Sequence, residues 1–255
     1  MRPLMTHNDV MEKEWFTAWF NSPYYHILYQ NRDEEEAKQF IDELLKYLQP
    51  PAGAAVLDLA CGKGRYSRYL AAKDLYVTGL DIADESIAFA RQFETAHLSF
   101  FTHDMRQPFR INYFDYIFNF FTSFGYFATE KDHRTTVANI ASGLRPGGTF
   151  VLDFFNSVKV VRDLRPYEHK TIGGIDFELH RRVDEEGYIV KEIEFVADGQ
   201  PQRFAERVRA FTLQDFQALF SQAGLQITTT FGDYSLGAFD PFDSDRLILI
   251  AHKHV

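Results

Sequence analysis

The sequence predicts an α/β protein with a Rossmann-like, doubly wound sheet of seven strands and a small antiparallel β insertion after the fifth strand. Three observations support this. Between residues 54 and 154, short apolar runs alternate with amphipathic segments, which is typical of a parallel sheet covered by helices on both faces. Between about 160 and 210, apolar and polar residues alternate without a helical pattern. A further helix and two apolar strands then complete the sheet.

The N-terminal region is expected to be helical. DVMEKEWFTAWF, residues 9–20, predicts a short helix with one apolar face. SPYYHILYQNR, residues 22–32, predicts a loop packed on the body, and residues 33–48 predict a longer helix. Pro50 and Pro51 end that helix. We therefore expect four segments: a helical cap and first helix (1–53), the Rossmann-like core (54–158), the insertion (159–210), and a C-terminal helix with two strands (211–255).

The elements of the core follow from the apolar pattern. Strands are expected near 54–59, 75–81, 98–102, 114–120 and 148–154, with helices over 64–73, 84–93 and 130–144. The pattern of the insertion predicts three strands, with turns at Asp184 to Gly187 and Asp198 to Pro201. Thr212 and Asp215 then form a T-x-x-D helix start, and two strands follow over 225–232 and 245–252.

Composition restricts the possible functions. The chain has 255 residues and a net charge of −9, so its average surface repels a phosphate backbone, and we expect no nucleic-acid partner. No apolar run reaches about 18 residues, so no membrane span is predicted. The single cysteine, Cys61, fits a reducing compartment, and we expect a cytoplasmic monomer or homodimer. The nine histidines form no metal-binding pattern.

One stretch organises the predicted site. In AAVLDLACGKGRYS, residues 54–67, an apolar strand leads into Asp58, and a turn of small residues precedes a helix. Such a turn lies at the carboxyl edge of an open α/β sheet, where a ligand can approach the backbone closely. The next strands end in Asp81 and Asp104, and the fourth is followed by FFTSFGY. Three acids and a small-residue turn at neighbouring strand ends are typical of a nucleoside site.

In order and spacing, these four strand ends resemble motifs I to IV of the class I S-adenosylmethionine-dependent methyltransferases, over roughly residues 33 to 155. The resemblance implies S-adenosyl-L-methionine as cofactor. Asp58 would accept a hydrogen bond from the amino group of the cofactor, directly or through water. Asp81 would bind the ribose, and Asp104 would accept from the adenine amino group. The other implied cofactor-binding residues are Tyr25, Arg32, Ala60, Cys61, Gly62, Gly64, Ile82, Met105, Asn119, Phe120 and Phe121.

A looser resemblance points to the acceptor. YYHILYQNRDEEEA, FTSFGY and the insertion leading into AFTLQDFQALFSQAGL are similar to small-molecule N-methyltransferases that act on amino sugars and glycine. This similarity implies that Tyr25 and His26 lie near the reacting centre, and that Ser123, Tyr126, Phe154 and Asn156 line the acceptor pocket. Tyr126 stands where the sugar enzymes can carry a histidine base. A neutral tyrosine, with a pKa of about 10, is a poor base at neutral pH.

The expected function is therefore methyl transfer from S-adenosylmethionine to a nitrogen or oxygen of a small molecule by in-line displacement. The alternatives are a protein or RNA acceptor, a non-catalytic cofactor-binding module, and a nicotinamide dehydrogenase, in which Asp104 and the insertion have no role. The arginines of the insertion either pair with neighbouring acids or recognise an anionic group on the acceptor. They are Arg181, Arg182, Arg203, Arg207 and Arg209.

Overall fold

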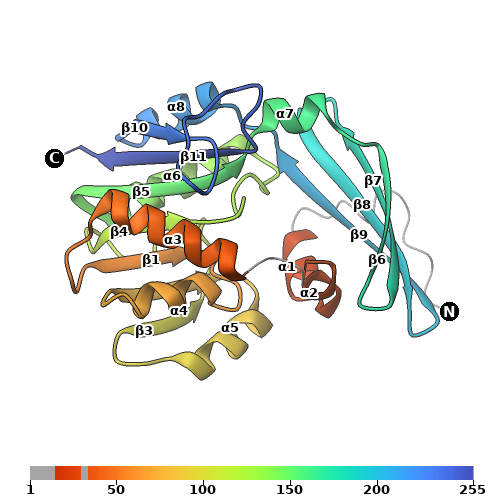
Figure 1. Ribbon diagram of the computed structural model, residues 1–255, viewed down its shortest axis with the longest axis horizontal. Helices are drawn as coiled ribbons and strands as arrows, with labels where there is room; N and C mark the ends of the chain where they lie inside the picture. Colours follow the sequence, from red (N-terminus) through yellow and green to blue (C-terminus); the bar gives the residue numbers. More distant parts are fainter. Residues whose placement is uncertain (1–14, 30–33, 255) are drawn as a thin grey trace.

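A computed structural model describes residues 15–29 and 34–254, and consists of two sheets with a short helical cap between them (Figure 1). The larger sheet has seven strands in the order β10-β11-β5-β4-β1-β2-β3. Its central strands run parallel, and β11 is antiparallel to both of its neighbours. The predicted Rossmann-like fold is confirmed. The strands are β1 (Ala55–Leu59), β2 (Tyr76–Asp81), β3 (Leu98–Thr102), β4 (Phe114–Asn119), β5 (Leu144–Phe155), β10 (Leu225–Phe231) and β11 (Arg246–Lys253).

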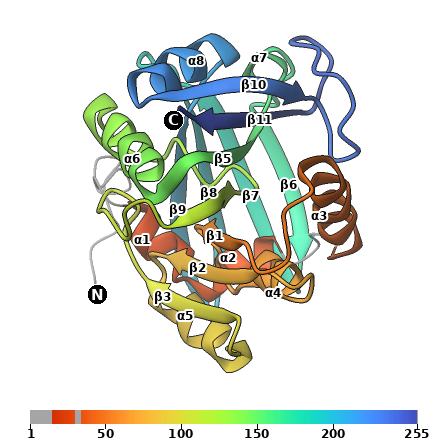
Figure 2. The same ribbon diagram turned by 90° about the vertical axis from the view of Figure 1, so that its left-hand side faces the viewer.

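Helices cover both faces of this sheet, with α3 and α6 on opposite sides (Figure 2). One hydrophobic cluster joins the sheet to α3, α4 and α5, and includes Phe40, Leu70 and Ile87. A second joins it to α6 and α8, and includes Val137 and Phe216. The strands are apolar on both faces because both are buried. The bounds are α3 (Glu34–Leu48), α4 (Arg65–Ala71), α5 (Asp84–Ala90), a 3-10 turn (Arg91–Phe93), α6 (Glu130–Gly143) and α8 (Leu213–Gln222).

Most predicted bounds agree with these within a few residues, and α8 begins with the expected cap. The Thr212 side chain accepts the Asp215 N–H, and the Asp215 carboxylate accepts the Thr212 N–H in return. The end of α6 differs from the prediction. The helix ends at Gly143 and β5 begins at Leu144, so residues 145–148 belong to the strand and Pro146 does not end the helix.

The cap consists of α1 (Trp15–Phe20) and α2 (Pro23–Leu28). The prediction of a loop over residues 22–32 is wrong for residues 23–28, which form α2. Ser22 caps this helix by accepting the Tyr24 N–H at 3.2 Å, and Pro23 occupies its first position, where a missing N–H costs nothing. Six residues are too few to show a helical period, which explains why the sequence pattern missed the helix. Residues 9–14 of the predicted first helix lie outside the described part of the chain.

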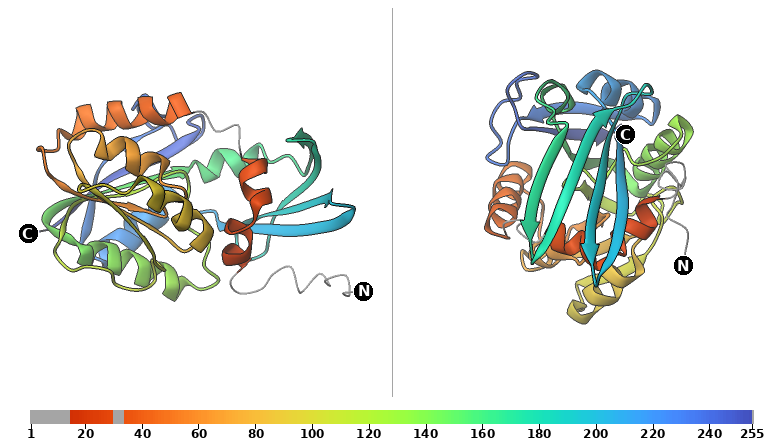
Figure 3. Two further views of the ribbon diagram at one scale, coloured as in Figure 1. Left: turned by 90° about the horizontal axis from the view of Figure 1, so that it is seen from below. Right: turned by 90° about the vertical axis from the view of Figure 1, so that its right-hand side faces the viewer.

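The insertion forms a four-stranded antiparallel sheet in the order β6-β7-β8-β9, seen face on in the right panel of Figure 3. The prediction of three strands is wrong because β6 is a largely exposed edge strand without alternation of buried residues. A short helix, α7 (Ser157–Arg162), which was also missed, precedes it. The strands are β6 (Tyr167–Ile172), β7 (Ile175–Val183), β8 (Tyr188–Ala197) and β9 (Gln200–Arg209).

The cap lies between the two sheets and packs on the inner face of the insertion (Figure 3, left). Trp19, Phe177 and Ile193 belong to one buried cluster there. Glu206 of β9 anchors the cap, because its Oε1 accepts hydrogen bonds from Trp19 Nε1 at 2.8 Å and from the Tyr29 hydroxyl at 2.6 Å. Lys191 Nζ, 3.3 Å from the Glu206 carboxylate, donates to the same hydroxyl at 2.6 Å. This largely buried group, the Glu206 cluster (Trp19, Tyr29, Lys191 and Glu206), therefore joins the insertion to the cap.

The arginines of the insertion are engaged within the chain. The ion pairs are Arg181–Glu168, Arg182–Glu192, Arg203 with Glu192 and Glu194, and Arg207 with Asp184 and Glu186. The guanidinium of Arg209 lies 5.3 Å from the centre of the Tyr188 ring. The structure thus favours pairing with neighbouring acids over recognition of an anionic acceptor. Of the helices in the described residues, none is long and apolar enough to span a bilayer.

Candidate active site

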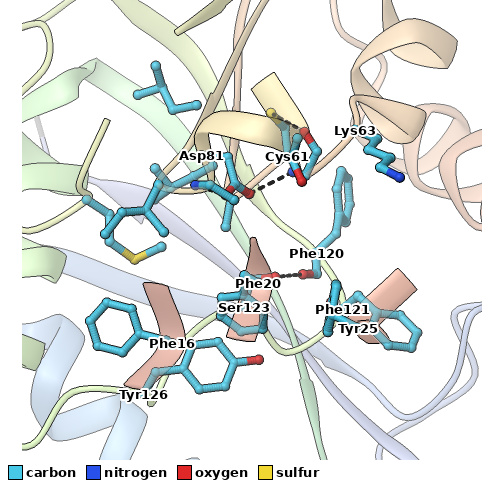
Figure 4. Close-up of a pocket in the computed structure, with 18 of the residues that line it drawn as sticks. Phe16, Phe20, Tyr25, Cys61, Lys63, Asp81, Phe120, Phe121, Ser123 and Tyr126 are labelled. Atoms are coloured by element: carbon cyan, nitrogen blue, oxygen red, sulfur yellow. Dashed lines mark hydrogen bonds between the residues drawn. The ribbon is translucent and has the colours of Figure 1, made fainter. Parts of the chain in front are cut away.

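A cavity of about 420 Å³ lies where the carboxyl ends of β1, β2 and β4 meet the cap. This volume is within the range of about 300–1,000 Å³ typical of small-molecule sites. In the view of Figure 4, Asp81 and Cys61 lie on one side of the cavity, and Phe16 and Tyr126 lie across it. Thirteen of the predicted residues line it: Tyr25, His26, Ala60, Cys61, Gly62, Asp81, Ile82, Asp104, Met105, Phe120, Phe121, Ser123 and Tyr126.

The turn after β1 forms one wall. Ala60 and Gly62 both have left-handed backbones, with φ of 64° and 54°. A Cβ added at Gly62 would meet no atom within 4 Å, so this glycine leaves open space beside the backbone. Gly64 has another role and is not among the described lining residues: a Cβ there would lie 2.5 Å from the Phe100 ring. It permits close packing of α4 on β3.

Asp81 connects two parts of the cavity wall. Its Oδ2 accepts the Gly62 N–H at 2.7 Å, and its Oδ1 accepts the Ala83 N–H at 2.8 Å (Figure 4 shows the first). Burial raises the pKa of this carboxyl, and the two hydrogen bonds oppose the shift. Because each carboxylate oxygen has more than one lone pair, Asp81 retains acceptor capacity for a ligand hydroxyl.

Asp58 and Asn119 lie in the sheet behind this wall and are not among the lining residues that the structure describes. Asp58 is 1% exposed, and its Oδ2 accepts the Ser67 hydroxyl at 2.5 Å. Burial raises its pKa to about 7; the Ser67 hydrogen bond opposes the shift, and the charge of Asp81 adds to it. Asn119 donates from Nδ2 to the Leu59 carbonyl at 2.8 Å, while its buried Oδ1 has no hydrogen-bond partner among the described atoms. Both side chains support the first turn from behind, and the direct or water-mediated contact of Asp58 with the cofactor stays a prediction.

Asp104 and Met105 follow β3 and border the cavity with Ile82. Arg106 holds the Asp104 carboxylate with three side-chain hydrogen bonds, the shortest 2.5 Å from Nη2 to Oδ2. Burial alone would raise the pKa of Asp104, but the hydrogen bonds and charge of Arg106 outweigh it and lower the pKa. Asp104 is therefore an ionised acceptor at neutral pH.

The fourth strand and the cap form the opposite wall, which is aromatic. The Ser123 hydroxyl donates to the Phe120 carbonyl at 2.8 Å. The Tyr126 hydroxyl donates to the Thr122 carbonyl, which commits its proton to the loop. Trp15 packs edge-on against the Tyr126 ring, with centroids 5.6 Å apart. This wall presents mostly ring faces and edges to the cavity.

Two predicted pocket residues lie elsewhere. Phe154 is fully buried and packs against Phe216, with ring centroids 5.1 Å apart, because β5 points its side chain into the core. Asn156 is 2% exposed and donates from Nδ2 to the carbonyls of Pro241 and Ser244, at 3.0 and 2.9 Å. It fixes the loop before β11 instead of facing the cavity. Arg32 lies outside the described residues.

The sequence reasoning missed several lining residues. They are Phe16, Phe20, Tyr29, Leu59, Lys63, Arg65, Tyr66, Leu80, Ala83, Ser86, His103 and Phe127. Lys63 and Arg65 stand inside the first motif, so their position was a usable signal. Phe16 and Phe20 belong to an aromatic segment whose partner the sequence does not reveal. Among the described side chains, no group of three or more His, Cys, Asp or Glu is arranged to hold a metal ion.

Comparisons with known proteins agree with this geometry. A family model described as a methyltransferase domain matches residues 56–148. A dTDP-3-amino-3,4,6-trideoxy-alpha-D-glucopyranose N,N-dimethyltransferase of Streptomyces venezuelae is 27% identical over 80% of this chain and 89% of its own length. YqeM of Bacillus subtilis, which carries a provisional methyltransferase name, is 28% identical over 83% of this chain and 90% of its own length.

Solved structures share the fold. A S-adenosylmethionine-dependent methyltransferase from Clostridium acetobutylicum has a TM-score of 0.77 at 20% identity, covering 91% of this chain and 96% of its own. An amino pentose methyltransferase from Micromonospora echinaspora has a TM-score of 0.67 at 19% identity, covering 91% of this chain and 97% of its own. These structures show the shared fold. The matched methyltransferase domain, the relatives that align with most of the chain and the cavity at the strand ends together identify the chain as an S-adenosylmethionine-dependent methyltransferase.

Proposed function

We propose that this enzyme transfers the methyl group of S-adenosylmethionine to a nitrogen or oxygen of a small molecule. The observation that carries the proposal is the wall opposite Asp81: the chain's own cap and the loop after β4 cover the cavity with Phe16, Phe20, Tyr25 and Tyr126. A site covered in this way favours a compact acceptor, and the net charge of −9 disfavours RNA. The amino-sugar acceptor in the name of the Streptomyces venezuelae relative supports the same class.

The residues present fit the cofactor. Asp81 keeps acceptor capacity for the ribose hydroxyls, and Asp104 is an ionised acceptor for the adenine amino group, with Ile82 and Met105 beside the ring. The open backbone from Ala60 to Gly62 suits the carboxylate end. When bound, the cofactor supplies an electrophilic methyl group on a cationic sulfur. We assign Tyr25, Phe120 and Phe121 to the methionine end, and Asp58, Gly64 and Asn119 to support of the turn.

The chain's own contribution to the reaction is orientation and exclusion of water. Holding two reactants in line can supply about 7–11 kcal/mol of the barrier in favourable cases. An amine acceptor must also release a proton. We assign this proton to His26, which lines the cavity, ahead of Tyr126, whose own hydroxyl hydrogen is donated to the Thr122 carbonyl. Ser123 and the ring of Tyr126 then serve to place the acceptor.

The cofactor site is tested by calorimetric titration of Asp81→Asn with S-adenosylmethionine. Asparagine keeps the volume and one acceptor oxygen but loses the charge, so we expect affinity to fall about 10- to 100-fold. Asp84→Asn, an exposed acid in the first turn of α5, is the matched control and should bind as the wild type does. Equal affinity in both variants would contradict the assignment of Asp81.

The acceptor class is tested by a transfer screen with methyl-labelled cofactor against amines, alcohols, carboxylic acids, a mixed RNA preparation and a protein extract. We expect label in a small amine or alcohol, and loss of that transfer in Asp81→Asn. Label confined to RNA or protein would overturn the small-molecule assignment. Firm cofactor binding without transfer to any acceptor class would favour a non-catalytic binding module.

A further inference from the structure

The turn after β4 has an unusual backbone. Phe121 and Thr122 both have φ of 57°, in the left-handed region. Non-glycine residues rarely adopt this conformation, and a β-branched threonine does so least readily. Phe120, Phe121 and Ser123 line the cavity on this turn. Two consecutive strained residues at a ligand-binding wall persist only where the surrounding structure fixes them.

Asp153 of β5 fixes this turn from behind. Its Oδ2 accepts the Phe121 N–H at 2.8 Å, and its backbone carbonyl accepts the Thr122 N–H at 2.8 Å. The Thr122 hydroxyl accepts the Phe155 N–H at 3.1 Å. Both backbone donors of the strained pair are therefore held by one residue of the neighbouring strand.

Arg246 and Tyr234 hold Asp153 in turn. Arg246 donates to Asp153 Oδ1 from Nη2 at 2.6 Å and from Nε at 2.8 Å, and its Nη2 also donates to the Thr122 hydroxyl at 3.1 Å. The Tyr234 hydroxyl donates to Asp153 Oδ2 at 3.1 Å. Asp153 is fully buried and the Arg246 side chain is 16% exposed. A buried ion pair adds little net stability compared with apolar packing, so the presence of this pair points to a geometric role.

The order of the strands says which part of the cofactor this turn meets. Along the carboxyl edge, the ends of β4, β1, β2 and β3 follow one another. The proposed function places the ribose at Asp81, after β2, and the adenine toward Asp104, after β3. The amino acid end and the transferred methyl group then lie toward β4. This step rests on the proposed function.

We propose that Asp153, Arg246 and Tyr234 are positioning residues that hold the Phe121–Thr122 turn against the methionine end of the cofactor. They act through the turn, since none of the three is among the described residues that line the cavity. The network sets where the Phe121 side chain and the Ser123 hydroxyl stand. The network thereby aligns the methyl donor, S-adenosylmethionine, without contacting it.

A matched pair of variants tests the proposal. Thr122→Val keeps the shape of the side chain but removes the hydroxyl that accepts from Arg246 and Phe155, while Thr122→Ser keeps the hydroxyl. Asp153→Asn keeps one acceptor oxygen and removes the charge opposite Arg246. Each variant is titrated with S-adenosylhomocysteine, which has the amino acid end, and with 5′-methylthioadenosine, which lacks it.

We expect Thr122→Val and Asp153→Asn to weaken S-adenosylhomocysteine binding about tenfold and 5′-methylthioadenosine binding less than about twofold. Thr122→Ser should bind both as the wild type does. Equal weakening of both ligands, unchanged binding of both, or the same loss in Thr122→Ser as in Thr122→Val would overturn the proposal.

Amide hydrogen exchange, measured without ligand, separates this proposal from the proposed function. Residues 119–127 should exchange faster in Thr122→Val and Asp153→Asn than in the wild type, with β1 unchanged. Unchanged exchange there would refute the network's hold on the turn. Asp81→Asn should weaken both ligands, because both carry the ribose. If it weakens neither, the proposed cofactor site fails, whatever the exchange shows.

Discussion

Asp58 should make the folded enzyme lose stability as the pH rises toward neutrality. Burial raises the pKa of its carboxyl to about 7, against an ordinary value of 3.8. An acid whose pKa is raised on folding holds its proton more tightly in the folded state than in the unfolded one. The resulting stabilisation is complete below the unfolded pKa and is lost as the pH rises through about 7.

The size of the effect follows from the shift. About three pKa units at about 1.36 kcal/mol each give about 4 kcal/mol in total. Between about pH 5.5 and about pH 8.5 the folded carboxyl keeps its proton for half of the interval, so about 2 kcal/mol should be lost there. Asp58→Asn retains an oxygen for the Ser67 hydroxyl and cannot ionise, so this loss should disappear.

Urea unfolding of the wild type and Asp58→Asn at a series of pH values measures the difference. The unfolding free energy of the variant minus that of the wild type should rise by about 2 kcal/mol between about pH 5.5 and about pH 8.5. Groups that titrate in both proteins cancel, and the exposed Asp84→Asn should show no such slope. A difference that is flat with pH, or that falls, would refute the reasoning.

Three further predictions concern the cap anchor, a buried histidine and the glycines of the first turn. Glu206→Gln leaves the largely buried charge of Lys191 without its carboxylate partner and should lower the free energy of unfolding by about 3–5 kcal/mol. Because both tryptophans of the chain stand in α1, a shift in tryptophan fluorescence should accompany this loss, and unchanged emission and stability would count against the anchor. Burial lowers the pKa of His133 to about 4, so wild-type stability should fall by about 3 kcal/mol as the pH drops from about 6.5 to 4; urea unfolding should show a shallower fall in His133→Gln, and equal slopes would refute this. Gly64→Ala forces a Cβ to within 2.5 Å of the Phe100 ring and should lower the melting temperature more than Gly62→Ala does. Gly62→Ala should chiefly weaken S-adenosylmethionine binding, and a larger drop in melting temperature for Gly62→Ala than for Gly64→Ala would contradict both roles.

The fold could be predicted because its strands are buried on both faces. All five residues of β1 are buried, and such a run, repeated between amphipathic helices, fits few architectures. Elements that are not buried on both faces lack this pattern, and several of them were missed. β6 is an exposed edge strand, and α2 is a six-residue helix whose aromatic residues pack on a distant sheet. Neither has a local pattern that distinguishes it from a loop.

The sequence predicts which residues stand at the strand ends that form the site, because the order of the strands determines where the backbone lies. Asp81 ends β2 and Asp104 follows the end of the neighbouring β3, so topology alone brings them to one edge of the sheet. Side-chain direction is a separate matter. Asp58 stands in the same motif as Gly62, yet its carboxylate lies in the sheet and meets Ser67. Phe154 faces the core because alternation along β5 directs it there. Part of the aromatic wall, including Phe16 and Phe20, comes from the cap, which precedes the first strand by tens of residues.

The Glu206 cluster explains how the cap, which lies far from the strand-end motifs in the sequence, keeps its position at the cavity. The cap is short, and a six-residue helix has too few hydrogen bonds of its own to be stable. Trp19 of α1 and Tyr29, which follows α2, both donate to the Glu206 carboxylate on β9. Lys191 on β8 balances the charge of that carboxylate. Because Tyr29 also borders the cavity, a shift of the insertion would displace part of the aromatic wall. The insertion is therefore a structural part of the cavity, although it contributes none of the described lining residues, and changes in its inner face should alter binding without changing a contact.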